Sequence, residues 1–222
     1  MWPRLITGKR KRGTRLHNHA GRLLDAAGFR YLPRSLLTTL SLKLANRRAE
    51  LPLLSFRAIK RLDRLIAPDW KVLEFGSGMS TIWFARRCGA LVSVETDRGW
   101  YDSVSKMLAE RGLGNVDYRF RAPSEAHVLE EYEDSHFDLA LVDGVARDCA
   151  MMTAIAKVKP GGYIYMDNTD SPDRSYKVAR SMLLRAAGGE ANVQVFNDLT
   201  PSRVYVTEGT LARVSNKMDD GG

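Results

Sequence analysis

Cysteine is scarce in this chain: Cys88 and Cys149 are the only two among 222 residues. Two thiols do not support a disulfide framework or a zinc site, so both are expected to be free and buried, as in a reducing cytoplasm. Long apolar runs are lacking as well. No stretch of 18 or more apolar residues occurs, so no membrane-spanning helix is expected. Residues 1–8 also lack the apolar core of a secretory signal. We therefore expect a cytoplasmic protein, either free or peripheral to a membrane.

Acidic residues are nearly absent from the first 48 positions, which hold twelve lysines and arginines but only one acid, Asp25. This segment carries a formal charge of +11, and the rest of the chain carries −3. The basic character therefore belongs to an N-terminal extension, residues 1–48. Residues 1–20, which include the basic run 9–12, are predicted to form a mobile arm. The arm is either a solvated tail or a contact for nucleic acid or an anionic membrane.

Within this extension, leucines from position 36 onward recur at helical spacing, at residues 36, 37, 40 and 44. The pattern predicts a helix that starts near Ser35 and ends near two arginines, Arg47 and Arg48. A packed helix or a lid is the favoured interpretation. An interfacial helix is the alternative, because the polar face is basic.

From residue 55 onward, helical and strand patterns alternate, which predicts a mainly parallel sheet covered on both faces. The expected helices are 55–66, 81–87, 100–111, 125–133, 148–158 and 173–187. The expected strands are 71–75, 91–95, 116–121, 137–142 and 163–166, followed by 193–196 and 203–206 as a closing hairpin around residues 197–202.

The most informative stretch runs from Lys71 to Ala85, where a buried strand breaks into Gly76-Ser77-Gly78 and then turns helical. Glycine suits a turn in which the backbone takes unusual dihedral angles and approaches a ligand closely. The next predicted strand ends in a carboxylate, Glu95, 17 positions after Gly78. A carboxylate at that place can accept hydrogen bonds from both hydroxyls of a ribose. The two features together indicate a nucleoside-type ligand.

In open α/β sheets, ligands lie beyond the carboxyl ends of the strands. Four of the five ends carry acids here: Glu74 lies at the first, Glu95 at the second, Asp143 at the fourth and Asp167 at the fifth. Carboxylates at so many strand ends indicate a site, although Asp143 and Asp167 could instead cap the helices that follow.

These stretches resemble the class I S-adenosylmethionine (SAM) dependent methyltransferases over about residues 55–207. The resemblance rests on 72–78, 92–95, 138–144 and the Lys159-Pro160-Gly161-Gly162 turn before the fifth strand. It implies a three-layer Rossmann-like fold whose seven-stranded, mostly parallel sheet has one antiparallel strand. The domains would be the basic helical extension 1–48, a SAM-binding domain 49–209 and a polar, disordered tail 210–222.

By this resemblance, Gly76 and Gly78 approach the methionine part of SAM, Glu74 fixes the turn and Glu95 holds the ribose. Residues near Arg121 flank the adenine, and Asp143 lies close to the sulfonium and amino end. The full set of cofactor-binding residues implied is Glu74, Phe75, Gly76, Ser77, Gly78, Ser80, Thr81, Glu95, Thr96, Arg121, Ala122 and Asp143. Many members have a third glycine where Ser80 stands.

A divalent cation is a second expectation from the resemblance. Asp143 with Asp167 and Asn168 is similar to the set that binds a cation in catechol-type O-methyltransferases, and hard oxygen ligands suit Mg²⁺. Asp143 and Asp167 are also the predicted catalytic residues. The alternative is a charge network that includes Arg147 and Asp170.

The favoured function is a SAM-dependent methyltransferase with an unidentified methyl acceptor. Val142-Asp143-Gly144-Val145 stands where amino-nitrogen methylases carry an Asn-Pro-Pro-Tyr type motif, which favours an oxygen on a small or glycan-like molecule. Two alternatives remain. An NAD-type oxidoreductase predicts a glycine where Thr81 stands, and a non-catalytic module would use the fold to present the basic arm. His127, after the third strand, either reaches the acceptor or is solvated.

Overall fold

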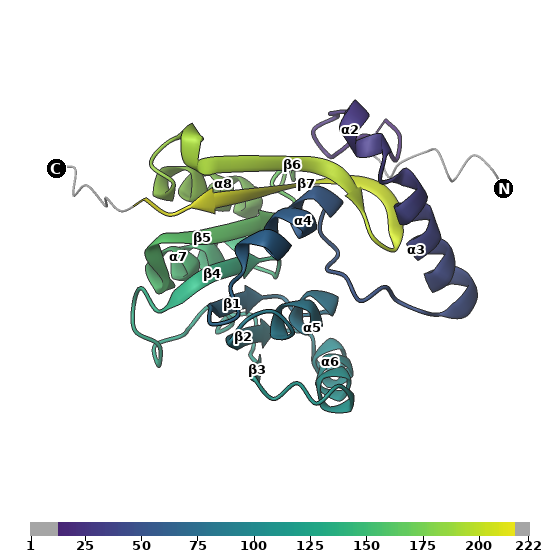
Figure 1. Ribbon diagram of the computed structural model, residues 1–222. Coiled ribbons are helices and arrows are strands. Elements are labelled where there is room, and N and C mark those ends of the chain that lie inside the picture. The colour runs from purple at the N-terminus through teal and green to yellow at the C-terminus, as the bar shows by residue number, and fades with distance from the viewer. Residues whose placement is uncertain (1–12, 216–222) are drawn as a thin grey trace.

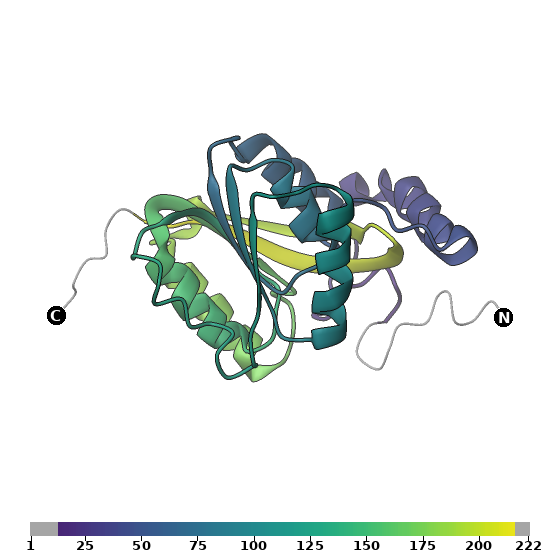
Figure 2. The same cartoon turned by 90° about the horizontal axis from the view of Figure 1, so that it is seen from below.

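The computed structural model describes residues 13–215. The basic run at residues 9–12 and residues 216–222 of the predicted tail lie outside the described residues. Helices pack on both faces of one central sheet, which gives the three layers predicted from the alternating pattern (Figure 1). Figure 2 shows the sheet edge-on between these two helical layers.

The strands of the sheet are β1 (Lys71–Phe75), β2 (Ala90–Glu95), β3 (Val116–Phe120), β4 (Phe137–Val142), β5 (Val158–Asp167), β6 (Val193–Thr200) and β7 (Arg203–Arg213). The helices are α2 (Ala26–Phe29), α3 (Leu32–Ala45), α4 (Phe56–Leu65), α5 (Met79–Ala85), α6 (Arg98–Glu110), α7 (Arg147–Lys157) and α8 (Arg174–Ala186), with a short 3₁₀ turn, η1 (Glu190–Asn192).

The strand order is β3-β2-β1-β4-β5-β7-β6, and β1 to β5 are mutually parallel. Only β7 runs against the others, since it pairs antiparallel with both β5 and β6. Strand order therefore reverses between β1 and β4, which brings the carboxyl ends of β1, β2 and β4 together. This is the predicted sheet, with its one antiparallel strand.

The core is divided by the alternation of side chains along each strand. Leu73 and Phe75 point to the face covered by α7 and α8. Val72 points to the opposite face, where α4 and α5 pack. Glu74 lies on the α5 face as well, directly beneath the start of that helix, and is fully buried. A carboxylate in that position must find its hydrogen-bond donors inside the protein.

The last strands are longer than predicted. β5 starts at Val158, so Lys159-Pro160-Gly161-Gly162 is a bulge within the strand, where the register against β4 shifts. The hairpin also closes over two residues, Pro201 and Ser202, because 197–200 continue β6. β7 reaches Arg213, beyond residue 209, where the sequence placed the domain boundary.

Two expectations, one of a helix and one of a mobile arm, were wrong. Residues 125–133 form consecutive turns instead of a helix. The hydroxyl of Thr153 donates a hydrogen bond to the carbonyl of His127, and Glu130 and Glu133 would lie three positions apart on a helix, where like charges repel. In addition, residues 13–20 are packed and are not a mobile arm. Asn18 is fully buried and donates a hydrogen bond to Glu208 of β7 at 3.1 Å.

The extension also differs from the packed helix that its leucines favoured. α2 and α3 lie beside the turn of the β6–β7 hairpin (Figure 1). A small cluster around Leu24, Phe56 and Leu199 joins this region to the domain. Yet the residue that α3 buries is Ser35, while its leucines at 36, 37, 40 and 44 are exposed. Within residues 13–215, no helix is long and apolar enough to cross a membrane.

Candidate functional site

The loop after β1 passes very close to the loop after β4. Gly76 has a φ of +88°, and a Cβ on it would lie 2.8 Å from the Cα of Gly144. Glycine is therefore required at position 76 by both conformation and contact. Gly78 is different: its backbone is extended, and a Cβ there would meet only the ring of Trp100, at 3.6 Å.

Glu74 holds this loop from below. Its Oε2 accepts hydrogen bonds from the hydroxyls of Thr81 and Ser93, each at 2.6 Å. Thr81 Oγ1 in turn accepts a hydrogen bond from the backbone N–H of Gly78 at 2.9 Å. Burial raises the pKa of Glu74 to about 7, against the opposing effect of these hydroxyl donors. Glu74 and Thr81 thus fix the turn from inside the protein.

Glu95 lies at the end of β2, next to the same loop. One oxygen, Oε2, accepts from the backbone N–H of Ser77 at 3.0 Å and from its hydroxyl at 2.6 Å. The other, Oε1, accepts from the N–H groups of Thr96 and Asp97 at 2.7 and 2.9 Å. These four bonds use the four acceptor positions of a carboxylate. The Ser77 hydroxyl also lies 2.7 Å from the hydroxyl of Tyr118, so it has a second partner.

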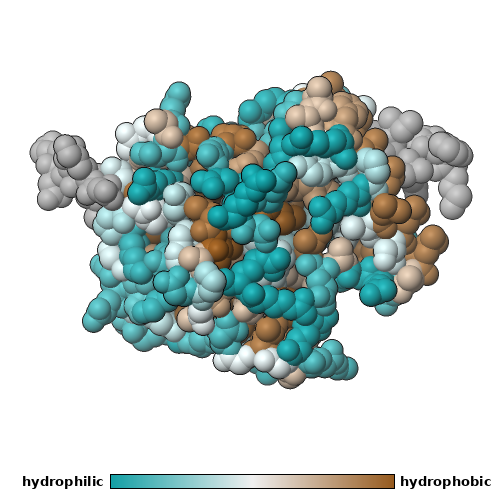
Figure 3. Space-filling view, viewed as in Figure 1, coloured by the Kyte–Doolittle hydropathy of each residue, from teal (hydrophilic) through white to brown (hydrophobic). Residues whose placement is uncertain are grey.

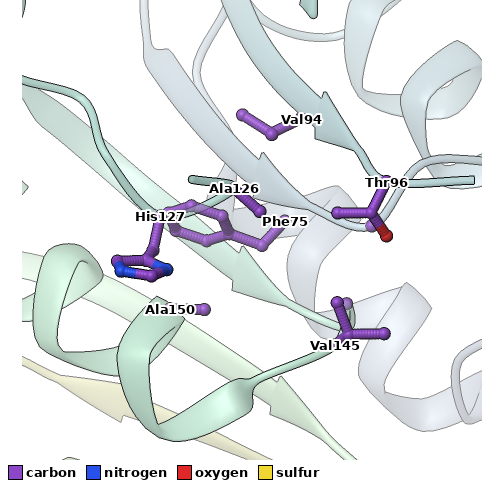
Figure 4. A pocket seen from close by; sticks show the side chains of 9 residues that line it. Phe75, Val94, Thr96, Ala126, His127, Val145 and Ala150 are labelled. Carbon is purple, nitrogen blue, oxygen red and sulfur yellow. The ribbon is translucent and has the colours of Figure 1, made fainter. Parts of the chain in front are cut away.

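A small hollow lies beside Gly76 at this edge. His127 and Ala150 lie at one end and Thr96 and Val145 at the other, with the Phe75 ring between them (Figure 4). Ligand pockets usually measure about 300–1,000 Å³. The hollow beside Gly76 has mostly apolar walls but is far smaller than such a pocket, so it does not hold a ring system in this conformation.

The wall residues after β3 are Ala126 and His127, not the predicted Arg121 and Ala122. Arg121 instead points its guanidinium at Glu131, with 3.5 Å between Nη2 and Oε1. The reason is the run of turns at 125–133, which carries Ala126 into the core. The Nδ1 of His127 is buried and has no hydrogen-bond partner within the described chain. The sequence places His127 either at the acceptor or in solvent; in the structure it lies in the wall of this hollow.

On the other side of the loop, Arg147 joins the ends of β4 and β5. Its Nη2 donates to Asp143 Oδ1 at 2.6 Å and lies 3.3 Å from Asn168 Oδ1. Its Nη1 donates to the carbonyl of Asp167. The guanidinium is 3 % exposed and lies over the ring of Tyr176, 4.3 Å from its centroid. The sequence offered Arg147 only as one member of an alternative charge network with Asp170. In the structure Arg147 pairs with Asp143, whereas Asp170 accepts a hydrogen bond from the backbone N–H of His19.

The expected Mg²⁺ site at Asp143, Asp167 and Asn168 is not supported. The guanidinium of Arg147 stands among these side chains, where a cation would have to sit. No group of three or more metal-ligating side chains occurs between residues 13 and 215. The positive charge that the sequence assigned to a metal is supplied by an arginine.

The two aspartates differ in their surroundings. Burial raises the pKa of Asp143, and Arg147 opposes the rise; three-tenths of its side chain reaches the surface. Burial and the nearby Asp143 raise the pKa of Asp167 well above its usual range. Asp167 is 4 % exposed, and its Oδ1 has no hydrogen-bond partner among the described residues. Of the two, only Asp143 presents its carboxylate to a ligand at the surface.

The sheet, the strand order and the loop at its carboxyl edge define the fold of the class I SAM-dependent methyltransferases. Solved structures share it. An O-methyltransferase from Bacillus cereus, in complex with SAH, is 19% identical, with a TM-score of 0.60 and coverage of 83% of this chain and 99% of its own.

Two further structures show the same fold with other described activities. An rRNA methylase from Streptococcus thermophilus is 12% identical, with a TM-score of 0.53 and coverage of 70% of this chain and 93% of its own. A precorrin 8W decarboxylase from Methanobacterium thermoautotrophicum is 20% identical, with a TM-score of 0.55 and coverage of 71% and 89%. No protein-family model matches the sequence, and no curated protein matches it. At these identities the likeness concerns the fold, and the function must be argued from the site.

Proposed function

We propose that the protein is a SAM-dependent methyltransferase that acts on an oxygen of an unidentified acceptor. The observation that carries the proposal is the convergence of three features at one sheet edge. The glycine loop after β1, the carboxylate of Glu95 and the mostly apolar hollow beside Gly76 adjoin one another. A base at the hollow, a ribose at Glu95 and a methionine chain along the loop form one continuous ligand.

The residues present fit this cofactor. SAM carries positive charge at its sulfur and its amino group, and acidic side chains favour such charges nearby. When bound, SAM supplies an activated methyl group. The carboxylate of Asp143 is the exposed acid on the β4 side of the loop. Glu95 can exchange the hydroxyl donor of Ser77 for a ribose hydroxyl, because Ser77 keeps Tyr118 as its partner.

Methyl transfer itself requires few further groups from the protein. Methyl transfer to a hydroxyl forms a carbon–oxygen bond, breaks the carbon–sulfur bond and releases the hydroxyl proton. The protein has to align the acceptor and take up that proton. Asp143 is the proposed group for this step; the catalytic assignment of Asp167, which is buried, stays a prediction, as does a cytoplasmic location from the scarce cysteines. The rRNA methylase of the same fold keeps a nucleic-acid acceptor as the second candidate.

Titration calorimetry of the full chain with SAM, SAH and NAD tests the proposal. We expect SAM and SAH to bind and NAD not to bind. A Gly78→Arg variant is expected to lose SAM binding while it keeps its fold, because the side chain would extend across the loop from a position that a Cβ tolerates. Gly114→Arg is the matched control, since the space around Gly114 is open. NAD binding without SAM binding would favour the oxidoreductase, and binding of neither would favour a non-catalytic module.

The same titration examines the aspartates. Asp143→Asn should weaken SAM binding, whereas Asp167→Asn should leave it unchanged, because only the Asp143 carboxylate reaches the surface. Equal losses in both variants would show that the two act on the cofactor only through Arg147.

A further inference from the structure

Exposed apolar side chains are concentrated on one part of the surface. Twelve large apolar side chains are exposed within the described chain, and six of them lie between residues 23 and 44. Four belong to α3: Leu36, Leu37, Leu40 and Leu44, with exposed fractions from 42% to 83%. We call these four the leucine face. Figure 3 shows apolar residues over α3, at the right edge of the molecule in that view.

Among residues 13–215, nothing covers the leucine face. α3 attaches to the domain through its opposite side, where Ser35 Oγ donates to the carbonyls of Thr200 and Arg203 at 2.9 and 3.1 Å. The backbone N–H of Ser202 donates to Thr38 Oγ1 at 2.9 Å. These are polar contacts to a hairpin turn. The helix is therefore held by these hydrogen bonds and by Leu32, which packs against the cluster around Leu24, Phe56 and Leu199, while the leucine face remains outside.

The geometry of the helix places an apolar stripe between two basic side chains. At about 100° per residue, Leu37, Leu40 and Leu44 lie within about 40° of the direction opposite Ser35. Lys43 falls on one flank of this stripe and Arg34 on the other. The Arg34 guanidinium also lies over Phe56, 5.2 Å from the ring centroid, which holds it in place. An apolar stripe between two basic flanks is typical of helices that lie in a membrane surface.

The charge around the leucine face indicates which kind of partner it fits. Residues 26–49 contain Arg30, Arg34, Lys43, Arg47 and Arg48 and no acid. Two copies of the chain joined through this face would bring like charges together without acids to pair them. A nucleic acid would match the charge but leave the leucines in water. An anionic lipid surface satisfies both, since headgroups pair with the basic residues and the acyl region receives the leucines.

We propose that α3 docks the protein onto anionic membranes through its leucine face. The position of the helix determines which edge of the sheet faces the membrane after docking. α3 contacts Thr200, the last residue of β6, and β6 runs parallel to β5. The helix therefore lies at the same edge of the sheet as the proposed cofactor site. Docking brings that edge to the bilayer.

Co-sedimentation of the full chain with vesicles tests the proposal. We expect binding to vesicles of phosphatidylcholine mixed with phosphatidylglycerol and much weaker binding to phosphatidylcholine alone. The variant Leu37→Gln/Leu40→Gln/Leu44→Gln should bind the anionic vesicles at least about tenfold more weakly, because it loses three inserted side chains and keeps every basic residue. Glutamine preserves the helix, and unchanged circular dichroism confirms it.

The matched control is Met152→Gln/Val178→Gln, which removes exposed apolar side chains from α7 and α8. This control should bind as the wild type does. A second variant, Lys43→Gln/Arg47→Gln, should reduce binding to the anionic vesicles and make it less sensitive to salt.

Three results would overturn the proposal. The first is equal vesicle binding by the leucine variant and the wild type. The second is a dimer in sedimentation equilibrium that the leucine variant abolishes, which would assign the face to a second copy. The third is salt-sensitive RNA binding that the leucine variant weakens while vesicle binding is absent.

Discussion

The carboxylates in the two halves of the carboxyl edge have different kinds of hydrogen-bond donor. On the β1–β2 side, Glu74 and Glu95 accept hydrogen bonds only from hydroxyl and backbone N–H groups. On the β4–β5 side, one buried guanidinium, Arg147, donates to the carboxylate of Asp143 and to the backbone carbonyl of Asp167. Uncharged donors can be replaced by ligand hydroxyls without leaving a charge unpaired. Replacing a buried guanidinium costs more free energy, because it leaves a charge unpaired. The first half is therefore suited to exchange partners with a ligand, and the second to hold its shape.

The largest effect on stability is expected when Arg147, which holds the β4–β5 half, is replaced. Arg147→Met should lower the free energy of unfolding by about 3–5 kcal/mol, because it leaves the half-buried Asp143 carboxylate without its guanidinium partner and the buried Asp167 carbonyl without its donor. Chemical denaturation of the two proteins measures the difference. Arg98→Met is the control, since the pair of Arg98 with Asp102 is exposed and should contribute about 1 kcal/mol or less. A loss for Arg147→Met no larger than that of the control would show that the guanidinium does not hold this half together.

Glu74 provides the next effect, which depends on pH. Burial raises its pKa from 4.5 to about 7, so between these values the folded protein holds a proton that the unfolded chain releases. The free energy of unfolding therefore falls as pH rises through this window, by at most about 3 kcal/mol. Glu74→Gln should remove this part of the decline, which denaturation at several pH values will show.

Other buried acids also have raised pKa values, Asp167 and Asp198 among them, so both proteins will share a residual slope. The difference between the wild type and the variant isolates Glu74. Glu125→Gln, at an exposed position, serves as the control. A parallel decline in wild type and Glu74→Gln would mean that Glu74 is ionised in the folded protein.

The sheet could be predicted from the sequence because its signals are local. Buried strands of five or six residues, bounded by glycine or a charged residue, recur at regular intervals. The strand ends then follow, and Gly76, Glu95 and Asp143 are placed at one edge by topology alone. The limits of β5 and β7 were not predictable in this way, since a bulge at Gly161 and a two-residue turn depend on pairing with distant strands.

The parts of the site that the sequence missed depend on contacts between distant segments. Spacing alone gives Asp143 and Asp167 the appearance of a metal site, because the position of the Arg147 guanidinium is set by tertiary packing. His127 lies in the wall of the hollow because Thr153, 26 residues away, bonds its carbonyl and prevents a helix. Likewise, helical periodicity identified the α3 leucines but did not show that the helix is held through Ser35.

Glu95 tests the exchangeable half directly. Glu95→Ala should weaken SAM binding by roughly 1–3 kcal/mol, through the loss of charged hydrogen bonds to the ribose. Titration calorimetry measures the change, with Glu190→Ala, an exposed acid outside the candidate site, as the control. Unchanged affinity in Glu95→Ala would remove this residue from the cofactor site and leave the β1–β2 half with a purely structural function.

The smallest and most discriminating effect belongs to Ser77. Its hydroxyl occupies one acceptor position of Glu95, and its backbone N–H occupies another. If a ribose must displace the hydroxyl, Ser77→Ala frees that position in advance, and SAM affinity should rise by up to about 1 kcal/mol, the net value of one hydrogen bond. If the hydroxyl instead bonds the cofactor itself, affinity should fall by a similar amount. Tyr118→Phe provides the control, because it leaves Ser77 bound to Glu95 alone and should make the displacement harder. Opposite signs for Ser77→Ala and Tyr118→Phe in the same titration would show that Glu95 exchanges an internal partner for the ligand. A loss of affinity in both variants would place the two hydroxyls in the cofactor site.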